Sequence, residues 1–282
     1  GYLMYNDPQN TFPGAQEVRT LDFTLEGGSK VSGSINVSTT DKSGSGLTQQ
    51  YLDVITIHSK GTSPNTITGS IIGTNADVST TVVEVENNVQ KVVLDLQQQL
   101  NIEGDIVFTN RGTVAGQTAT LTLTGAANAS VQQLDVSDAE IGTLVVVQNG
   151  SGTLTQAGTS PALFDGTDTG IGGVANLETL TFTGTGTGNI KFGDADSTTS
   201  PWGITAENLS TINASGFAGG LDLGAIDGVD NRDFTFTSGT GLTKLTMVSD
   251  TLNADDTAGL GLDQSGTWTF NLANAAAGSQ LH

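Results

Sequence analysis

Apolar and polar residues alternate along many short stretches of this chain, and each stretch is followed by a turn that contains glycine. In the stretch TLDFTLEGGSKVSGSINV, Leu21, Phe23 and Leu25 occupy every second position, and the alternation resumes after Gly33. Side chains two positions apart lie on the same face of a β-strand. The pattern therefore predicts short strands that bury one face and are joined by tight turns.

The same plan recurs along nearly the whole chain. Successive turn glycines are 32 to 36 residues apart, except across one longer gap that contains the shorter copy TATLTLTGAANASVQQLDV; these glycines are Gly33, Gly69, Gly104, Gly152, Gly188 and Gly220. One such unit cannot bury its apolar face alone, but stacked units share a continuous core. We therefore predict an all-β fold, a β-solenoid or β-helix of roughly seven to eight irregular coils.

Two further points of organisation stay open. Tandem antiparallel β-sandwiches also use many short strands at regular spacing, so they are the alternative fold. The chain divides into a β-rich N-terminal region, residues 1–110, and a Thr/Gly-rich solenoid region, residues 111–282, or forms one continuous unit.

One segment, residues 87–100, fits two structures. Val89, Val92 and Leu96 have helical spacing, and the glutamines that follow favour a helix, whereas Val92, Leu94 and Leu96 alternate as in a strand. We expect either a strand or a short helix that caps or interrupts the stack.

Composition narrows the classes of partner. The chain has 282 residues, 13% of them charged, with 29 acidic against 9 basic residues and a net charge of −20. This charge repels nucleic acid and anionic membrane surfaces. No stretch approaches the 18 to 20 apolar residues of a membrane-spanning helix. We therefore predict no nucleic-acid partner and no membrane insertion.

The Gly-rich stretch TFTGTGTGNIKF does not fit a dinucleotide site. Its glycines, Gly184, Gly186 and Gly188, have the spacing G-x-G-x-G, whereas the dinucleotide fingerprint needs G-x-G-x-x-G between a strand and a helix. The residues that follow alternate like a strand. We interpret these glycines as the turn of one repeating unit.

Catalytic constellations are sparse. The chain has no cysteine and two histidines, and the alternation places His58 on the outward face of its strand, where we expect a solvated side chain. Arg232 lies among acidic residues in DGVDNRDF, an arrangement that a polysaccharide-active β-helix enzyme would use. A charged turn explains this segment as well, and we predict that the protein is not an enzyme.

Calcium is the cofactor that the turns suit best. Ca²⁺ takes six to eight oxygen ligands, which turns rich in Asp, Asn, Thr and backbone carbonyl groups supply, although Asp also favours turns for local reasons. The candidate ligands lie in four segments and are Asp165, Asp168, Asp194, Asp196, Asp227, Asp230, Asp233, Asp255 and Asp256.

The segments NLETLTFTGTGTGNIKF and NLSTINASGFAGGLDL resemble the Thr/Gly/Ala-rich coils of bacterial S-layer proteins and large secreted RTX-type adhesins, most clearly over residues 115–275. The resemblance implies β-solenoid segments at the cell exterior, calcium-dependent folding, lattice assembly and no enzymatic activity. The chain lacks the nonapeptide repeats of that family.

The leading functional prediction is a structural protein of the bacterial cell surface or extracellular matrix that self-assembles into an S-layer lattice or filament, with cell-surface polysaccharide as a further partner. The alternative is an adhesin segment that binds glycan or surfaces, with Trp202 or Trp268 as a stacking platform. A polysaccharide-active enzyme is the third hypothesis.

Overall fold

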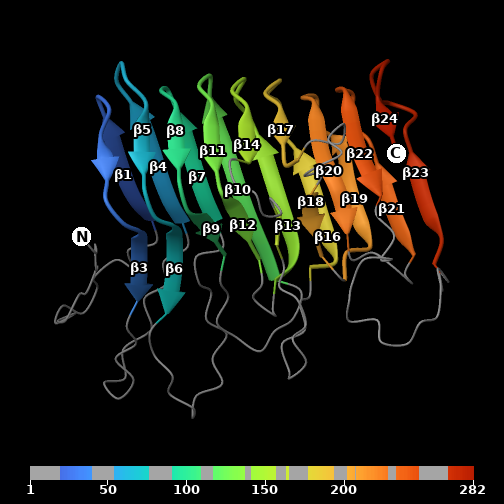
Figure 1. Ribbon diagram of the computed structural model, residues 1–282, viewed down its shortest axis with the longest axis horizontal. Coiled ribbons are helices and arrows are strands. Elements are labelled where there is room, and N and C mark those ends of the chain that lie inside the picture. The colour runs from blue at the N-terminus through green and yellow to red at the C-terminus, as the bar shows by residue number, and fades with distance from the viewer. Residues whose placement is uncertain are drawn as a thin grey trace, which may run out of the picture.

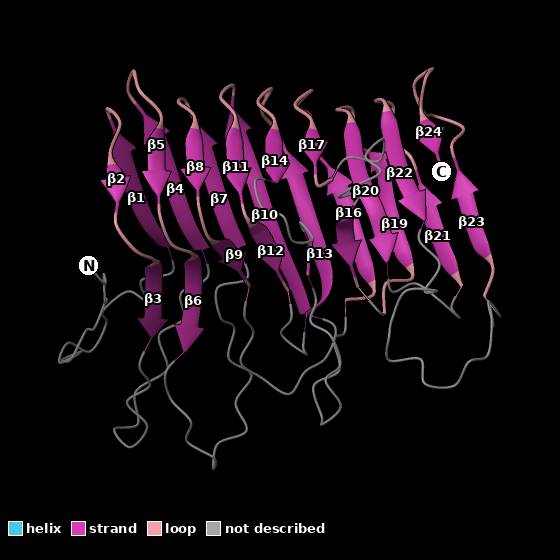
Figure 2. Ribbon diagram, viewed as in Figure 1, coloured by secondary structure: helices cyan, strands magenta, loops and turns pink. Residues whose placement is uncertain are grey.

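The computed structural model describes the chain in eleven stretches: residues 20–39, 54–75, 91–108, 117–136, 141–156, 163–164, 177–193, 202–206, 208–227, 233–247 and 266–282. All regular structure in these stretches is β-strand, and Figure 2 shows strands joined by loops with no helix. The strands form two sheets, which we call the first sheet and the second sheet.

The first sheet has nine strands, and neighbouring strands in it come from successive parts of the chain. Alternating Leu, Ile, Val and Phe with Thr favours strands here, because branched and aromatic side chains pack well on a pleated surface. In spatial order the strands are β1 (Thr20–Glu26), β4 (Val54–Lys60), β7 (Lys91–Leu96), β10 (Gln117–Gly125), β13 (Ile141–Gln148), β16 (Thr179–Thr183), β19 (Thr211–Gly216), β21 (Phe234–Thr237) and β23 (Trp268–Asn271).

The second sheet consists of two rows of short strands that meet at β20 (Leu221–Asp227), which pairs with the last strand of both rows. One row is β2 (Lys30–Val31), β5 (Asn65–Ile67), β8 (Leu100–Ile102), β11 (Ala129–Val131), β14 (Leu154–Gln156) and β17 (Ile190–Lys191). The other is β3 (Ile35–Thr39), β6 (Ile71–Asn75), β9 (Asp105–Val107), β12 (Gln133–Asp135), β15 (Leu163–Phe164) and β18 (Trp202–Thr205). Beyond β20 lie β22 (Thr243–Met247) and β24 (Gln280–Leu281).

Each strand of the first sheet therefore begins a unit. The one or two strands of the second sheet that follow it along the chain complete that unit. Figure 1 shows the units following one another from the blue N-terminal end to the red C-terminal end. Every strand pair in the described stretches is parallel. Parallel pairing of equivalent strands is consistent with a β-helix or solenoid-like fold, and it excludes the antiparallel sandwich for these stretches.

The structure revises the expected number of coils and resolves the ambiguous segment. The nine strands of the first sheet give nine units in the described part of the chain, one or two more than the expected seven to eight coils. In the ambiguous segment, Lys91–Leu96 and Leu100–Ile102 are strands rather than a helix, because Val92, Leu94 and Leu96 extend the buried columns of the neighbouring strands. Both sheets continue across the expected boundary between residues 110 and 111, since β7 pairs with β10 and β9 with β12.

The core lies between the two sheets. Inward side chains of successive strands are in register and form apolar columns; one of them is Leu21, Ile55, Val92, Leu121, Val146 and Phe182. Phe182 of the first sheet contacts Phe192, which follows β17, with ring centroids 5.8 Å apart. Burial of each such side chain stabilises the fold by about 1.5–3 kcal/mol.

Glycine columns form the turns of the C-terminal units. Gly186 and Gly188 are buried, and their N–H groups donate to the carbonyl oxygens of Gln148 and Gly150 at 2.9 and 3.1 Å. A Cβ on Gly188 would overlap the carbonyl oxygen of Gly152 in the preceding unit, and a Cβ on Gly186 would overlap that of Gly150. These turns require glycine because successive backbones touch there, which confirms their structural interpretation.

The turn of the first two units has a similar contact, because a Cβ on Gly61 would overlap the backbone of Gly27, and it is also held by a buried side chain. Asn65 accepts hydrogen bonds from the N–H groups of Gly28 and Ser29 at 3.1 and 2.8 Å. Its amide nitrogen donates to the carbonyl oxygen of Leu25, to Ser59 Oγ and to the carbonyl oxygen of Lys60, at 3.2, 3.0 and 3.0 Å. This one fully buried amide therefore satisfies backbone groups of two units.

Candidate functional site

The predicted calcium ligands lie mostly outside the described stretches, namely Asp165, Asp168, Asp194, Asp196, Asp230, Asp255 and Asp256. Asp227 is the last residue of β20. Asp233 is exposed, and its Oδ1 accepts a hydrogen bond from the N–H of Thr267 in the next unit at 2.8 Å. Within the stretches that the structure describes, no three His, Cys, Asp or Glu side chains come close enough to hold a metal ion. Calcium binding stays a prediction.

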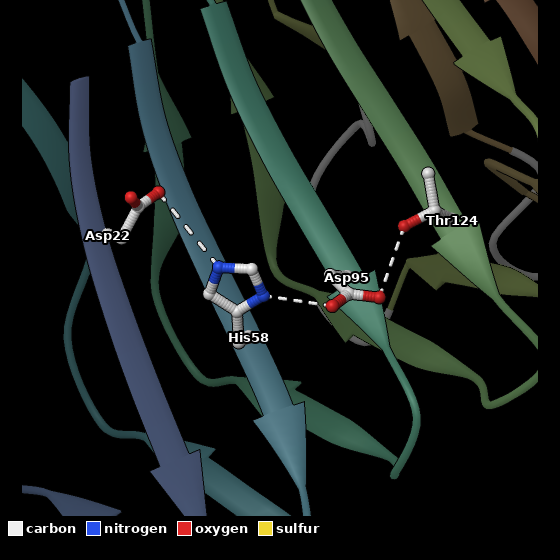
Figure 3. A network of polar contacts seen from close by, with 4 residues as sticks. All are labelled: Asp22, His58, Asp95 and Thr124. Atoms are coloured by element: carbon white, nitrogen blue, oxygen red, sulfur yellow. Dashed lines mark hydrogen bonds and ion pairs between the residues drawn. The ribbon is translucent and has the colours of Figure 1, made fainter.

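A polar network crosses the outer face of the first sheet at its N-terminal end (Figure 3). It joins four successive strands, because Asp22, His58, Asp95 and Thr124 come from β1, β4, β7 and β10. His58 Nδ1 lies 2.8 Å from Asp95 Oδ2, and since a carboxylate oxygen can only accept, the imidazole donates this bond. Thr124 Oγ1 donates to Asp95 Oδ1 at 3.3 Å, and His58 Nε2 lies 3.9 Å from Asp22 Oδ1.

The electrostatics of the network follow from the central hydrogen bond. The bond from His58 lowers the pKa of Asp95 below its ordinary value, partial burial opposes this, and the bond from Thr124 adds to the lowering. The sequence prediction that His58 faces outward is correct, but its side chain is only 27% exposed and is paired rather than simply solvated. The signal that identifies the pair is strand register, which places His58 directly beside Asp95.

This network does not have the arrangement of a nucleophilic catalytic site. The hydroxyl of Thr124 bonds the carboxylate of Asp95 instead of the imidazole, and the second ring nitrogen of His58 faces Asp22. A Ser-His-Asp mechanism needs the hydroxyl on the imidazole nitrogen that faces away from the carboxylate. The contacts among these four side chains instead connect four neighbouring strands of the first sheet.

Two aspartates, Asp105 and Asp135, lie on neighbouring strands of the second sheet. Asp105 Oδ1 is buried without a hydrogen-bond partner, and burial raises the pKa of Asp105, with a smaller contribution from the negative charge of Asp135 on the next strand.

The other residues that the sequence singled out for glycan binding or catalysis are not described beside Asp105 or His58. Trp268 is half-buried and packs against the core, the described part of Trp202 is its backbone pairing with Ala225, and Arg232 lies outside the described stretches.

The last unit of the described stretches exposes side chains that are buried in the unit before it. Leu281 of β24 is 41% exposed, whereas its register partner Leu245 of β22 is 1% exposed. Phe270 of β23 is half-buried, whereas its partner Phe236 is fully buried. Among the described strands, β23 pairs only with β21 and β24 only with β22. We call the face formed by β23, Leu272 and β24 the open end.

Comparison with known proteins does not place the chain in a family. No protein-family model, no curated protein and no solved structure matches the chain. In the portion that the structure describes, no helix is long and apolar enough to cross a membrane.

Proposed function

We propose that this chain is a structural protein of the bacterial cell surface or extracellular matrix, which associates with further copies of itself into a lattice or filament. In this proposal the two parallel sheets are opposite walls of one β-solenoid, and each unit is one coil. Support for the solenoid comes from the pairing of each unit with the next in both sheets. Stacks of this kind grow by adding units, because each unit contacts only its neighbours.

The open end, as the described strands present it, is the observation that carries the proposal. An edge strand leaves backbone N–H and C=O groups unpaired, which makes it a template for pairing with another chain. Leu272 and Leu281, 36% and 41% exposed, add apolar surface there. Another copy that places its β1 beside β23 would extend the first sheet and cover this surface. At the opposite end, Leu21 and Phe23 of β1 are also only half-buried.

The negative net charge of each copy opposes association, and calcium would counter it. Two copies that each carry a net charge of −20 repel one another, and dissolved cations weaken that repulsion. A divalent cation held by turn carboxylates would remove charge from the contact itself. We therefore propose that calcium promotes assembly, with ligands among the nine aspartates named above.

The test is the size distribution of the purified chain in solution and its appearance in negative-stain electron micrographs. The Leu272→Lys/Leu281→Lys variant places two charges on the open end, and we expect it to shift assemblies to monomers. Leu242→Lys is the matched control, because Leu242 is also 41% exposed but lies between β21 and β22, inside the stack. We expect the control to assemble as the wild type does.

Measurements in calcium and in chelator separate the two parts of the proposal. Assembly that disappears in chelator and returns with calcium supports both parts. Assembly that persists in chelator rejects the role of calcium only. A chain that stays monomeric at high concentration in calcium, or assembles equally well with lysines at the open end, rejects self-association through that end.

The adhesin and enzyme hypotheses receive no comparable support. Trp268 packs against the core, as a side chain that closes the stack would do, rather than standing on the surface as a sugar platform.

A further inference from the structure

The outer face of the first sheet carries a column of six threonines in direct register, one on each strand from β10 to β23. The partners along this column are paired strand by strand, and all six side chains are half-buried or exposed. The column consists of Thr118, Thr143, Thr179, Thr211, Thr235 and Thr269.

A second column lies two residues further along the same strands. It contains threonine on alternate strands, at Thr120, Thr181 and Thr237, and Val145 between the first two. Its other positions are Asn213 and Asn271, whose side-chain oxygens accept from the backbone N–H groups two residues further along the chain. Three strands therefore present the pair Thr-x-Thr to solvent.

These two columns, which we call the threonine face, contain no charged residue, although the chain as a whole carries a net charge of −20. The carboxylates nearest in sequence are at its rim: Glu178 precedes Thr179, and Asp233 is bonded to the N–H of Thr267. On the first three strands, by contrast, the outer face carries Asp22, His58 and Asp95. The uncharged area thus begins at β10.

The spacing of the hydroxyl groups is set by the sheet. Neighbouring parallel strands lie about 4.8 Å apart, and side chains two residues apart on one strand lie about 6.6 Å apart. Both repeats are close to distances between water oxygens in planes of hexagonal ice. Threonine has a restricted χ1, so its hydroxyl is held in position before any ligand binds. That hydroxyl both donates and accepts, as a water molecule does, and the methyl group beside it excludes mobile water.

We propose that the threonine face binds ice. Its neutral, regular array of hydroxyl and methyl groups matches a neutral, regular lattice, and no ion needs to lose its hydration shell when the two surfaces meet. The inference concerns the side of the stack and is independent of assembly through the open end.

A second copy of the chain fits this face less well. Six strands and two columns offer roughly 300–500 Å² per partner, below the roughly 800 Å² of a stable protein interface. The two columns also contain no Trp, Tyr or Arg, the residues that dominate binding energy between proteins.

The experiment measures the growth of ice grains and the thermal hysteresis of the purified chain, against serum albumin at equal mass. We expect the wild type to slow recrystallisation. A Thr179→Lys/Thr211→Lys variant places two hydrated charges at the centre of the face, and we expect it to need at least about tenfold more protein for the same effect. Thr155→Lys on β14 is the matched control, since this half-buried threonine faces outward from the second sheet; its activity should equal that of the wild type.

Thr235→Lys provides an independent variant at an exposed position, where folding tolerates a lysine, and circular dichroism verifies the fold of each variant. A wild-type chain in which ice grows as it does with albumin overturns the proposal. Full activity of the folded lysine variants overturns it as well. So does a wild-type dimer, seen by sedimentation without ice, that Thr235→Lys dissociates, because the face would then be an interface between copies.

Discussion

The N-terminal strands β1, β4 and β7 and the C-terminal strands β13, β16 and β21 have similar inner faces but different outer faces and turns. Inward side chains form apolar columns in both regions, such as Ile57 beside Leu94 and Leu180 beside Leu144. Outside, the N-terminal region has ionisable side chains paired across strands, and the C-terminal region has uncharged threonines. The stack therefore depends on its inner columns, and its surface chemistry varies independently along its length.

The turns of the two regions differ in one respect. Glycine backbones touch in both regions, at Gly27 and Gly61 and at Gly152 and Gly188, but the first turn is also held by the side chain of Asn65, which bonds backbone groups of two units. A side chain contributes hydrogen bonds that one substitution can remove. A glycine contact leaves no space that a substitution can occupy.

The largest expected effect is from Gly188→Ala. Its Cβ would overlap a backbone carbonyl oxygen that cannot move without displacing the preceding unit, so we expect the free energy of unfolding to fall by about 3 kcal/mol or more. Gly216→Ala is the control, since its Cβ would lie 3.0 Å from Thr183 Oγ1, a hydroxyl that can rotate away. Urea unfolding curves measure both, and equal stabilities would refute the backbone contact.

A smaller loss is expected from Asn65→Ala in the N-terminal region. The substitution removes the acceptor of the part-buried N–H groups of Gly28 and Ser29 and the side-chain donor to the carbonyl oxygen of Leu25, at a cost of about 2–3 kcal/mol. Asn101→Ala is the matched control, because Asn101 faces outward and accepts from Gln99 Nε2 and Ser130 Oγ. Its expected cost is below about 1 kcal/mol. If both variants lose the same stability, the buried amide has no special role in this turn.

The smallest expected effect concerns the surface pair. Because the hydrogen bond from His58 lowers the pKa of Asp95, the ionised carboxylate stabilises the folded state above pH 4, and this contribution is lost as the pH falls through the lowered pKa. Asp95→Asn should cost less than about 1 kcal/mol at pH 7 and progressively less as the pH falls from 4 towards 2. Unfolding curves at both pH values test this.

Asp22→Asn serves as the control for that measurement. Asp22 is 61% exposed and lies 3.9 Å from His58, so its removal should change stability less than removal of Asp95 at either pH. A loss at pH 7 that persists unchanged at pH 2 would show that the Asp95 side chain acts by packing rather than by charge.

Much of the fold could be predicted from sequence because its determinants are local. Alternation such as Leu21, Phe23, Leu25 predicts strands directly, and Gly188 marks its turn, so the all-β repeating architecture was accessible. The ambiguity at Val92 was resolved only by its partners Ile55 and Leu121, which lie on neighbouring strands. Helical and strand spacing coincide over so short an apolar run.

The surface chemistry could not be predicted in the same way, because it depends on register. His58 and Asp95 are 37 residues apart, and Thr179 and Thr211 are 32 apart, so neither neighbour is visible until the strands are aligned. The sequence does place each of these side chains on an outward position. Which residues then meet is decided by loop lengths between units, and these vary along the chain.

The in-register stacking of units also controls how long the molecule is. Each unit contributes one strand to the first sheet, so duplication of a unit in the gene would lengthen the rod by about 4.8 Å and add one more residue to every column. Deletion of a unit would shorten it by the same step. Length can therefore change in fixed increments while the existing columns and turns keep their neighbours.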